Sequence, residues 1–342
     1  VSDLSVYFIP VLSSDCAIRV NHYTTIEECF FVASSAASLF RYGAVGVLSC
    51  NGVILRNNTS AGASFINASA LPDGATGWII SGNEILAVPS GLEAGIGLWD
   101  CKDMVISDNI VSVPDSNDAA IGACPGISVV TNGAFQSQGI TIRDNFISVG
   151  NNAPAQTNSV AGIYLREVWL STVSGNVITR AAGSATQIGV GIYFDSLAQC
   201  SIVDNKIGFM GGGIYGVGYL YDTEISRNKM QGLFQVAISV VVNYFPVLNS
   251  TYGLRIEQND IYVMAKGLNG GLFANPDLYG IVVAVDLATA DSSLSGFSVS
   301  NNFMAGMGSV GSGAGVYGVL FDVDGGTGFC KSLRIDDNCI GC

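Results

Sequence analysis

The sequence predicts an all-β fold, a single-stranded right-handed parallel β-helix (a solenoid) with a short N-terminal capping helix. Three observations lead to this prediction. A short phrase containing Asn returns nine times along the 342 residues. The residues before each Asn alternate as in a β-strand, and the spacing between copies varies. The composition, with 43 Gly, 49% hydrophobic and 12% charged residues, suits coils with an apolar interior and tight corners.

The repeated phrase is a β-type pair, one or two polar residues, Asn, and an aliphatic residue or Met two positions later. Repetition of this kind is typical of solenoids. The separation varies from 23 residues (Asn205 to Asn228) to 43 residues (Asn259 to Asn302), which favours fixed strands joined by turns of variable length over a helical repeat. The nine copies contain Asn83, Asn109, Asn145, Asn176, Asn205, Asn228, Asn259, Asn302 and Asn338.

The segments before these Asn residues, such as Val105–Ser107 and Leu254–Ile256, have the period of two that predicts a strand. Each strand should pair with its equivalent one coil away, about 4.8 Å along the axis. Asn tolerates the left-handed conformation that corners need, and stacked Asn amides can bond to one another. We therefore expect the nine Asn residues to form a ladder and not a ligand site.

A second phrase, Gly-Ile-x-aliphatic, precedes many copies, beginning at Gly95, Gly126, Gly162, Gly191 and Gly280. Five longer insertions rich in Gly, Asn, Ser and Pro should be loops that shape a binding face. They are Pro114–Pro125, Gly150–Val160, Val241–Tyr252, Gly267–Tyr279 and Ala305–Gly315.

Residues 1–45 differ from the repeats and are expected to form a cap, followed by the β-helix over residues 46–342. Thr25 and Glu28 fit a capping box, and Cys29 to Phe40 then predicts a short amphipathic helix. Such a helix would cover the open strand edges of the first coil.

The net charge of −13, with only 14 Lys and Arg, disfavours nucleic acid or an anionic membrane surface as a partner. No unbroken apolar run of about 18 residues predicts a membrane-spanning helix. The surplus of apolar residues indicates either a long buried interior or apolar outer faces that become buried in a homo-oligomer, formed as a trimer or end to end.

The nine Cys leave several interpretations open. Cys101, Cys124 and Cys200 lie in or beside repeat strands, where Cys is a small core residue. A disulfide among Cys16, Cys29 and Cys50, or one between Cys330 and Cys339, is the alternative to structural thiols, and a metal site is disfavoured. The one His, His22, is expected at the surface or in the cap. No metal or cofactor is predicted.

The two phrases together resemble the parallel β-helix repeat of carbohydrate-binding proteins and sugar hydrolases. This is the pectin-lyase-like superfamily, which includes many phage tailspikes. The clearest copy runs from Gly191–Asp195 through Cys200–Ile207, and the resemblance covers residues 78–342. It implies the fold and a polysaccharide ligand, but these repeats carry no catalytic signature of their own.

The activity motifs of the superfamily's well-known enzymes are missing. The only Asp-Asp pair is Asp336-Asp337 in the last repeat, and His22 precedes the repeats, so no Gly-His-Gly exists. Arg255-Ile256 is followed by Glu257 where a polygalacturonase-like enzyme has Lys. Basic residues are too scattered to propose a calcium-dependent lyase site. These departures disfavour the known activities without excluding every enzyme.

Aligning the Gly-Ile strands predicts one chemically rich face, because residues alternate between inside and outside. One outward row should hold Gly97, Tyr164, Tyr193 and, with a small shift, Tyr219. The next row should hold Trp99, Arg166, Asp195 and Tyr221, and the following turn Asp100, Glu167, Ser196 and Asp222. Aromatic rings beside carboxylates are typical of sugar-binding surfaces.

A glycoside hydrolase needs two carboxylates, about 5 Å apart in retaining and about 6.5–9.5 Å apart in inverting enzymes. Glu167, with Trp169 as its aromatic neighbour, is the predicted acid. Asp195 is the predicted nucleophile or base, with Asp222 as its alternative. The competing interpretation is structural, because corner Asp residues bond backbone amides and Tyr rows stiffen sheets.

The sequence thus predicts an extracellular, cell-surface or virion-displayed β-helix that binds a polysaccharide and could cleave it. If the protein is an enzyme, paired carboxylates predict a hydrolase and not a calcium-dependent lyase. The first alternative is a non-catalytic fibre or shell component that self-assembles through apolar faces. The second is a monomeric secreted lyase or hydrolase, which the missing motifs disfavour.

Overall fold

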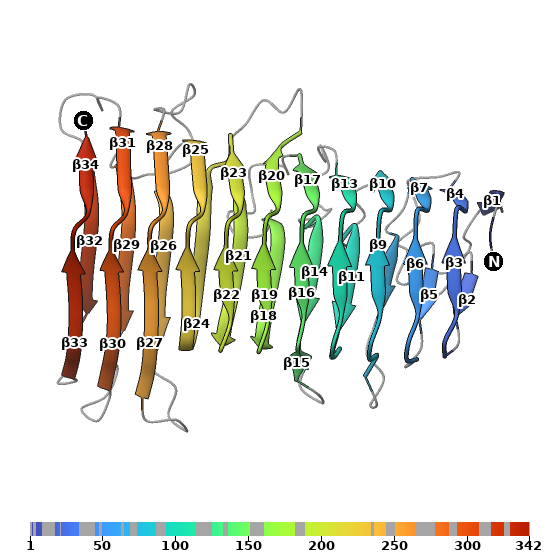
Figure 1. Cartoon of the computed structure of the whole chain (residues 1–342), viewed down its shortest axis with the longest axis horizontal. Helices are drawn as coiled ribbons and strands as arrows, with labels where there is room; N and C mark the ends of the chain where they lie inside the picture. The colour runs from blue at the N-terminus through green and yellow to red at the C-terminus, as the bar shows by residue number, and fades with distance from the viewer. Residues whose placement is uncertain are drawn as a thin grey trace.

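The computed structural model describes residues 2, 5–8, 18–20, 22–33, 45–47, 50–62, 65–68, 74–86, 94–113, 125–132, 136–150, 161–181, 189–233, 236–243, 250–264, 278–286, 293–307, 316–324 and 329–341. Over these residues the chain is a parallel β-helix, as predicted. All named strand pairs are parallel, and each strand pairs with its equivalent one coil away (Figure 1). Within the described ranges no helix of the length and hydropathy needed to cross a bilayer occurs.

Three stacks of strands form the faces of the solenoid. Face 1 contains β2 (Ile18–Val20), β5 (Val45–Val47), β8 (Ile66–Ala68), β11 (Ile96–Trp99), β14 (Ile127–Val130), β18 (Ala161–Trp169), β21 (Val190–Ala198), β24 (Gly212–Ser226), β26 (Val236–Asn243), β29 (Leu278–Asp286) and β32 (Val316–Asp324). The long strand β24 continues from face 1 into face 2.

Face 2 follows face 1 in each coil. It contains β3 (Thr25–Glu27), β6 (Ile54–Arg56), β9 (Ile79–Ser81), β12 (Val105–Ser107), β16 (Thr141–Arg143), β19 (Thr172–Ser174), β22 (Ser201–Val203), the end of β24, β27 (Ser250–Glu257), β30 (Ser293–Ser300) and β33 (Phe329–Asp336). The short β15 (Ser137–Gln138) pairs with the end of β18.

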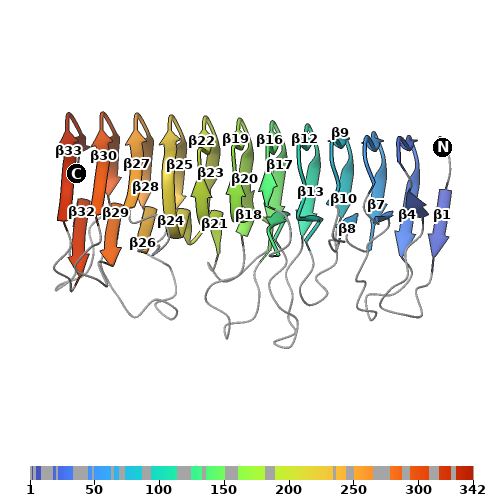
Figure 2. The same ribbon diagram turned by 90° about the horizontal axis from the view of Figure 1, so that it is seen from below.

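Face 3 is a separate 12-stranded sheet. It contains β1 (Ser5–Phe8), β4 (Phe30–Ala33), β7 (Thr59–Ala61), β10 (Glu84–Leu86), β13 (Ile110–Val113), β17 (Phe146–Val149), β20 (Val177–Arg180), β23 (Lys206–Gly208), β25 (Lys229–Leu233), β28 (Asp260–Met264), β31 (Phe303–Met307) and β34 (Cys339–Gly341). Its strands stay nearly parallel from one end to the other (Figure 2).

The interior is a continuous apolar column, because every second residue of each strand points inward. Residues such as Ile163, Ile192, Ile214 and Ile238 occupy equivalent positions on successive coils of face 1 and are fully buried. Burial of these aligned side chains, at roughly 25 cal/mol per Å² of apolar surface, is the main stabilising contribution.

The predicted Asn ladder is present and is longer than predicted. Between faces 2 and 3 each Asn side chain accepts from the backbone N–H and Nδ2 of the Asn one coil earlier, as Asn205 does from Asn176 at 3.1 and 2.9 Å. Asn58 is an additional member, bonded to Asn83. Cys29 occupies the same position one coil earlier, and its N–H donates to Asn58.

The Gly-Ile phrase has a steric cause. A Cβ atom on Gly162 would meet the Ile178 side chain of the same coil and the Gly191 carbonyl of the next. Gly95 faces Val111 in the same way, and Gly191 faces Ile207. Glycine is therefore required by the close approach of face 1 to the buried side chains of face 3, and not by a left-handed backbone.

The left-handed conformation instead marks two other corners. One is the residue before each ladder Asn, such as Asp144 (φ 57°) and Asp204 (φ 58°). The other lies between faces 1 and 2 and includes Leu170 (φ 48°) and Gln199 (φ 53°). Asn, Asp and Gly dominate the first corner because they tolerate this conformation at least cost.

The predicted N-terminal helix is wrong in its first part. Thr25–Glu27 and Phe30–Ala33 are strands β3 and β4, which pair with β6 and β7. The β-helical pairing therefore begins before residue 46, and Glu28 is the left-handed corner residue and not part of a capping box. The sequence was misleading because Ala- and Ser-rich composition outweighed a strand pattern with Ile26 and Phe31 inside. Residues 34–40 lie outside the described residues.

The strands that flank the long insertions show where each insertion begins and ends. Four of the five connect face 3 to face 1, between β13 and β14, β17 and β18, β28 and β29, and β31 and β32. The fifth, at 241–252, connects face 1 to face 2 between β26 and β27. Most of their residues lie outside the described ranges.

Five cysteines that the structure describes with their side chains form no disulfide: Cys29, Cys50, Cys101, Cys200 and Cys339. Cys101 is fully buried in the core as predicted, and burial raises its pKa to about 12. The alternative disulfides that use Cys29, Cys50 or Cys339 are therefore not formed. Cys16, Cys124 and Cys342 lie outside the described residues.

Candidate functional site

A column of three tyrosines runs along face 1 on β18, β21 and β24. Tyr164 pairs with Tyr193, and Tyr193 pairs with Tyr215, at the same outward position of successive coils. The first two were predicted, but the third member is Tyr215 and not Tyr219. The signal for Tyr215 was present in the sequence, because Gly213-Ile214-Tyr215 repeats Gly162-Ile163-Tyr164 and Gly191-Ile192-Tyr193.

The three rings stack on each other. The ring centroids are 5.4 Å apart for Tyr164 and Tyr193 and 5.7 Å apart for Tyr193 and Tyr215, with interplanar angles of 26° and 14°. Because both faces of the Tyr193 ring are covered by its neighbours, that ring cannot stack on a sugar. The column can offer ring edges and a row of phenol hydroxyls, one per coil. Tyr193 therefore differs from an open aromatic ring on which a sugar face can pack.

The phenols of Tyr164 and Tyr193 are hydrogen-bonding groups whose pKa values are raised by burial. Burial raises the pKa of Tyr193 to about 12, with smaller contributions from Tyr164 and Asp195. Burial also raises the pKa of Tyr164, although Arg166 opposes this shift. A phenol in its protonated form can both donate and accept a hydrogen bond.

A charged row lies beside the tyrosine column, two residues further along each strand. Its order is Trp99, Val130, Arg166, Asp195 and Val217. Arg166 is exposed and Asp195 partly exposed, on adjacent coils. Trp99 is in the predicted row but is separated from Arg166 by the coil of Val130.

A left-handed bend follows this row. Asp100, Glu167 and Ser196 occupy it with φ values of 44°, 51° and 63°, as the sequence predicted for these three. The bend is fixed by hydrogen bonds between coils: the N–H of Asn132 donates to Asp100 Oδ1 at 2.6 Å, and Thr131 Oγ1 donates to the Glu167 carbonyl at 2.7 Å. Ser196 Oγ donates to Asp195 Oδ1 at 3.1 Å, which fixes that carboxylate against the bend.

Tyr221 and Asp222 do not lie in the rows that were predicted for them. Compared with β21, β24 has one extra residue between Val217 and Leu220, so that Leu197 pairs with Leu220 and Ala198 pairs with Tyr221. Asp222 (φ 45°) lies one corner further on, at the position equivalent to Gln199 and not to Ser196. The shift starts at Gly218 (φ 100°), where any side chain would meet Ser196 and Asp195.

The same insertion creates an aromatic contact that the sequence did not predict. The indole N–H of Trp169 donates to the hydroxyl of Tyr219 across two coils, at 3.4 Å. Ala198, on the coil between them, pairs with Trp169 and is only 4% exposed. Tyr221 lies beside Ala198 and is 41% exposed. These aromatic side chains lie between the charged row and face 2.

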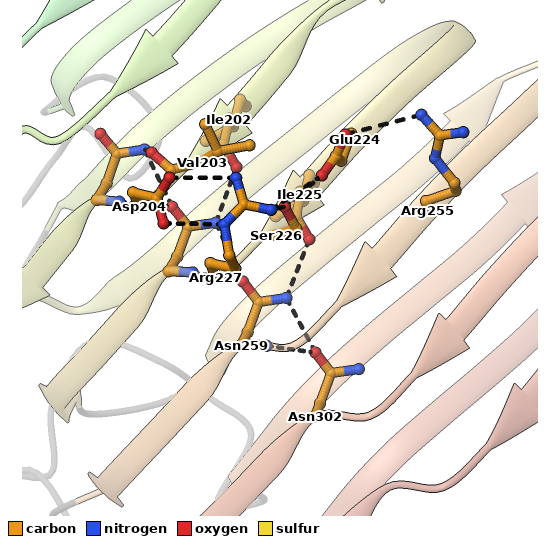
Figure 3. A network of polar contacts seen from close by, with 12 residues as sticks. Ile202, Val203, Asp204, Glu224, Ile225, Ser226, Arg227, Arg255, Asn259 and Asn302 are labelled. Carbon is orange, nitrogen blue, oxygen red and sulfur yellow. Dashed lines mark hydrogen bonds and ion pairs between the residues drawn. The ribbon is translucent and has the colours of Figure 1, made fainter.

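Asp222 takes part in a surface ion-pair network instead. Arg255 lies 3.8 Å from Asp222 and 3.7 Å from Glu224. Arg227 binds Asp204 through two nitrogens, at 3.0 and 3.1 Å, and lies 3.7 Å from Glu224 (Figure 3). All five charges are thereby paired at the surface, where such pairs each contribute about 0–1 kcal/mol. Asp222 therefore lies in this ion-pair network and not in the row of Arg166 and Asp195.

The site that remains is a strip on β18, β21 and β24. It combines phenol hydroxyls, one guanidinium, the carboxylates of Glu167 and Asp195, and the Trp169–Tyr219 contact. Glu167 lies at the bend and Asp195 lies in the charged row, one residue earlier, on the adjacent coil, and both carboxylates can accept hydrogen bonds from hydroxyl-rich ligands. Within the described residues no group of three or more His, Cys, Asp or Glu could hold a metal ion.

No family model matches the chain, and no curated protein matches its sequence. The solved structures that match this chain include the following two. The surface protein and adhesin PfbA of Streptococcus pneumoniae has a TM-score of 0.46 and 10% identity, covering 97% of this chain and 91% of that chain. The periplasmic alginate epimerase AlgG has a TM-score of 0.31 and 14% identity, covering 86% and 73%. At these values the function must be argued from the residues of this chain.

Proposed function

We propose that the protein binds a polysaccharide along face 1, over the strip formed by β18, β21 and β24. The observation that carries this proposal is the column of Tyr164, Tyr193 and Tyr215 beside the row of Arg166 and Asp195. Hydrogen-bonding groups recur once per coil, so the strip suits an extended polymer that lies parallel to the axis and repeats its hydroxyl groups along its length.

Each element of the strip has a role in this proposal. The phenols donate to and accept from sugar hydroxyls, while Arg166 donates and Asp195 accepts. Ser196 fixes the Asp195 carboxylate in place, which reduces the side-chain entropy lost on binding. Tyr221, at 41% exposed, offers an aromatic surface at the end of the strip where an apolar sugar face can pack.

The charge of the strip favours an uncharged polysaccharide over a polyuronate. Glu167 and Asp195 are accompanied by the buried carboxylate of Asp100 on the same face, against one guanidinium, Arg166. A polyanionic chain lying over these groups would meet net repulsion, and the whole chain carries −13. A ligand of this class belongs to cell envelopes and capsules, so the proposed location is outside the cell or on a virion.

Glycoside cleavage is the second candidate activity, favoured by one observation. Glu167 lies at the bend and Asp195 lies one residue before the equivalent position on the adjacent coil; coils are separated by about 4.8 Å, which is of the same order as the carboxyl separation of about 5 Å in retaining enzymes. Glu167 would protonate the leaving oxygen and Asp195 would attack the anomeric carbon. No cofactor enters this scheme.

The binding proposal is tested with a panel of neutral and acidic polysaccharides immobilised on a resin. Retention of the wild-type protein by at least one neutral polymer, lost in Tyr193→Ser and in Arg166→Ala, is the expected result. Tyr317→Ser is the matched control, because Tyr317 stacks on Tyr279 on the same face but away from the charged row. Equal retention of all variants would contradict the proposed site.

Cleavage is tested separately by measuring new reducing ends on any retained polymer. Shortening that disappears in both Glu167→Gln and Asp195→Asn would make the protein a hydrolase with this site. Retention without new reducing ends would leave the binding function and remove the catalytic one.

A further inference from the structure

Face 3 carries a row of outward side chains that is apolar at its centre, with Glu84 and Lys229 at equal distances on either side of that centre. From β4 to β31 the row is Phe30, Thr59, Glu84, Ile110, Phe146, Val177, Lys206, Lys229, Asp260 and Phe303. Its apolar members are unusually exposed for their size, with Ile110 at 50% and Phe146 at 45%. Leu86, in the neighbouring outward row, is 49% exposed.

We propose that face 3 is an interface with a second copy of this chain, packed antiparallel about a two-fold axis. The axis would run parallel to the strands, between β17 and β20. Such an axis reverses the order of coils while it keeps the position along each strand. Phe146 then faces Val177 of the second copy, Ile110 faces Lys206, and Glu84 faces Lys229.

This arrangement brings one pair of opposite charges in the row together. Glu84 meets Lys229 twice, once on each side of the axis, and the apolar stem of Lys206 covers Ile110. Phe30 and Phe303, which lie at equal distances from the axis, would also face each other. The side chain of Lys229 lies against face 3, because its ammonium is 5.3 Å from the ring centroid of Tyr262.

A parallel arrangement of two or three copies places equal coils against each other. Lys206 and Lys229 would then approach their own copies, and like charges directly opposite are destabilising. The charges of face 3 therefore favour an antiparallel pair over a parallel arrangement of two or three copies. An isologous pair is also the commonest symmetric oligomer.

The expected contact area is small for a specific protein–protein interface. Nine coil steps of about 4.8 Å and strands of about 10 Å give a footprint on the order of 450 Å² per copy. The total of about 900 Å² lies just below the range of stable specific interfaces, which begins near 1,200 Å². We therefore expect a reversible dimer with a dissociation constant in the micromolar range.

The test is sedimentation equilibrium of the full chain under reducing conditions, which keeps the exposed thiol of Cys339 from cross-linking copies. The wild type should show a concentration-dependent dimer. Phe146→Asn should raise the dissociation constant at least tenfold. Ile79→Asn is the matched control, because Ile79 is an exposed aliphatic residue on face 2 (41%), and it should leave the constant unchanged.

A charge swap tests the antiparallel register. Glu84→Lys and Lys229→Glu should each raise the dissociation constant at least fivefold, and the double variant should return to within about twofold of the wild type. A monomer at all concentrations, a dimer insensitive to Phe146→Asn, or a double variant weaker than either single one would each overturn the proposal. None of these outcomes depends on glycan binding.

Discussion

Trp169 and Tyr219 lie two coils apart along the solenoid, and yet the indole N–H of Trp169 donates to the Tyr219 hydroxyl at 3.4 Å. The contact exists because Tyr219 follows the left-handed Gly218 at a register shift, and because the residue between the two rings is Ala198. A small side chain on the intermediate coil leaves the space in which the rings approach.

The Trp169–Tyr219 contact predicts the effect of a larger residue at position 198. Ala198→Leu should separate the two rings and expose the indole of Trp169, seen as a red shift of tryptophan emission. The core should be retained, because Ala198 points outward, so the thermal midpoint should fall by only a few degrees. An unchanged emission spectrum would contradict the contact. Tyr219→Phe is the control that removes the hydrogen bond without adding volume.

The Asn ladder predicts a position-dependent loss of stability. Asn176→Ala leaves the N–H of Asn145 and the carbonyls of Ile142 and Ser174 without their partners inside the fold. The expected loss is about 3 kcal/mol, because each buried unsatisfied group costs about 1–3 kcal/mol. Asn338→Ala should cost about 1 kcal/mol, since water reaches that partly buried position. Urea denaturation checks both values, and equal losses would contradict the explanation.

Ser60 predicts a stabilising substitution. Its hydroxyl is buried with no hydrogen-bond partner, in the inward column between Phe31 and Ile85. Ser60→Ala should therefore raise the free energy of unfolding by about 1 kcal/mol. Ser171→Ala is the opposite case, because Ser171 Oγ accepts from the Ile140 N–H at 2.9 Å and donates to the Trp169 carbonyl at 2.6 Å. Loss of stability in both variants would contradict the interpretation that the Ser60 hydroxyl has no hydrogen-bond partner.

Much of the fold could be predicted from the sequence, and the reasons are local. Strand alternation, left-handed corners and stacked Asn residues each depend on a few neighbouring residues, so nine ladder positions could be identified. Asn58 was missed because Arg56-Asn57-Asn58-Thr59 lacks the aliphatic residue two positions after Asn. The strand at Phe30–Ala33 was missed because its pairing with β7 lies 29 residues away.

The candidate site could be predicted only in part, because it depends on register between coils. Tyr164, Tyr193, Arg166, Asp195 and Glu167 lie where the alternation placed them. Tyr219, Tyr221 and Asp222 were assigned to the wrong rows because Tyr219 was aligned with Tyr193, whereas the residue that pairs with Tyr193 is Tyr215. Ring orientation was also beyond the sequence, since stacking of Tyr193 between two tyrosines depends on coil spacing and not on residue type.

The raised pKa of Tyr193 predicts a pH dependence at the alkaline end. The unfolded phenol titrates near 10 and the folded one near 12, so the folded state binds more protons between these values. Stability should therefore fall as pH rises from 10 to 12. Tyr193→Phe should make this fall less steep and remove a late component from the absorbance titration at 295 nm. Tyr317→Phe serves as the control, and an equal effect of both would contradict the assignment.

The central claim is that the strip on face 1 binds a polysaccharide, and a titration tests it most directly. The dissociation constant of the wild type for a neutral polymer that it retains would be compared with that of Tyr193→Ser, Arg166→Ala and Tyr317→Ser by calorimetry. The account predicts at least tenfold weaker binding for the first two variants, unchanged binding for Tyr317→Ser, and weaker binding of the wild type to a polyuronate. Unchanged binding in Tyr193→Ser and Arg166→Ala, or no binding to any polymer of the panel, would contradict it.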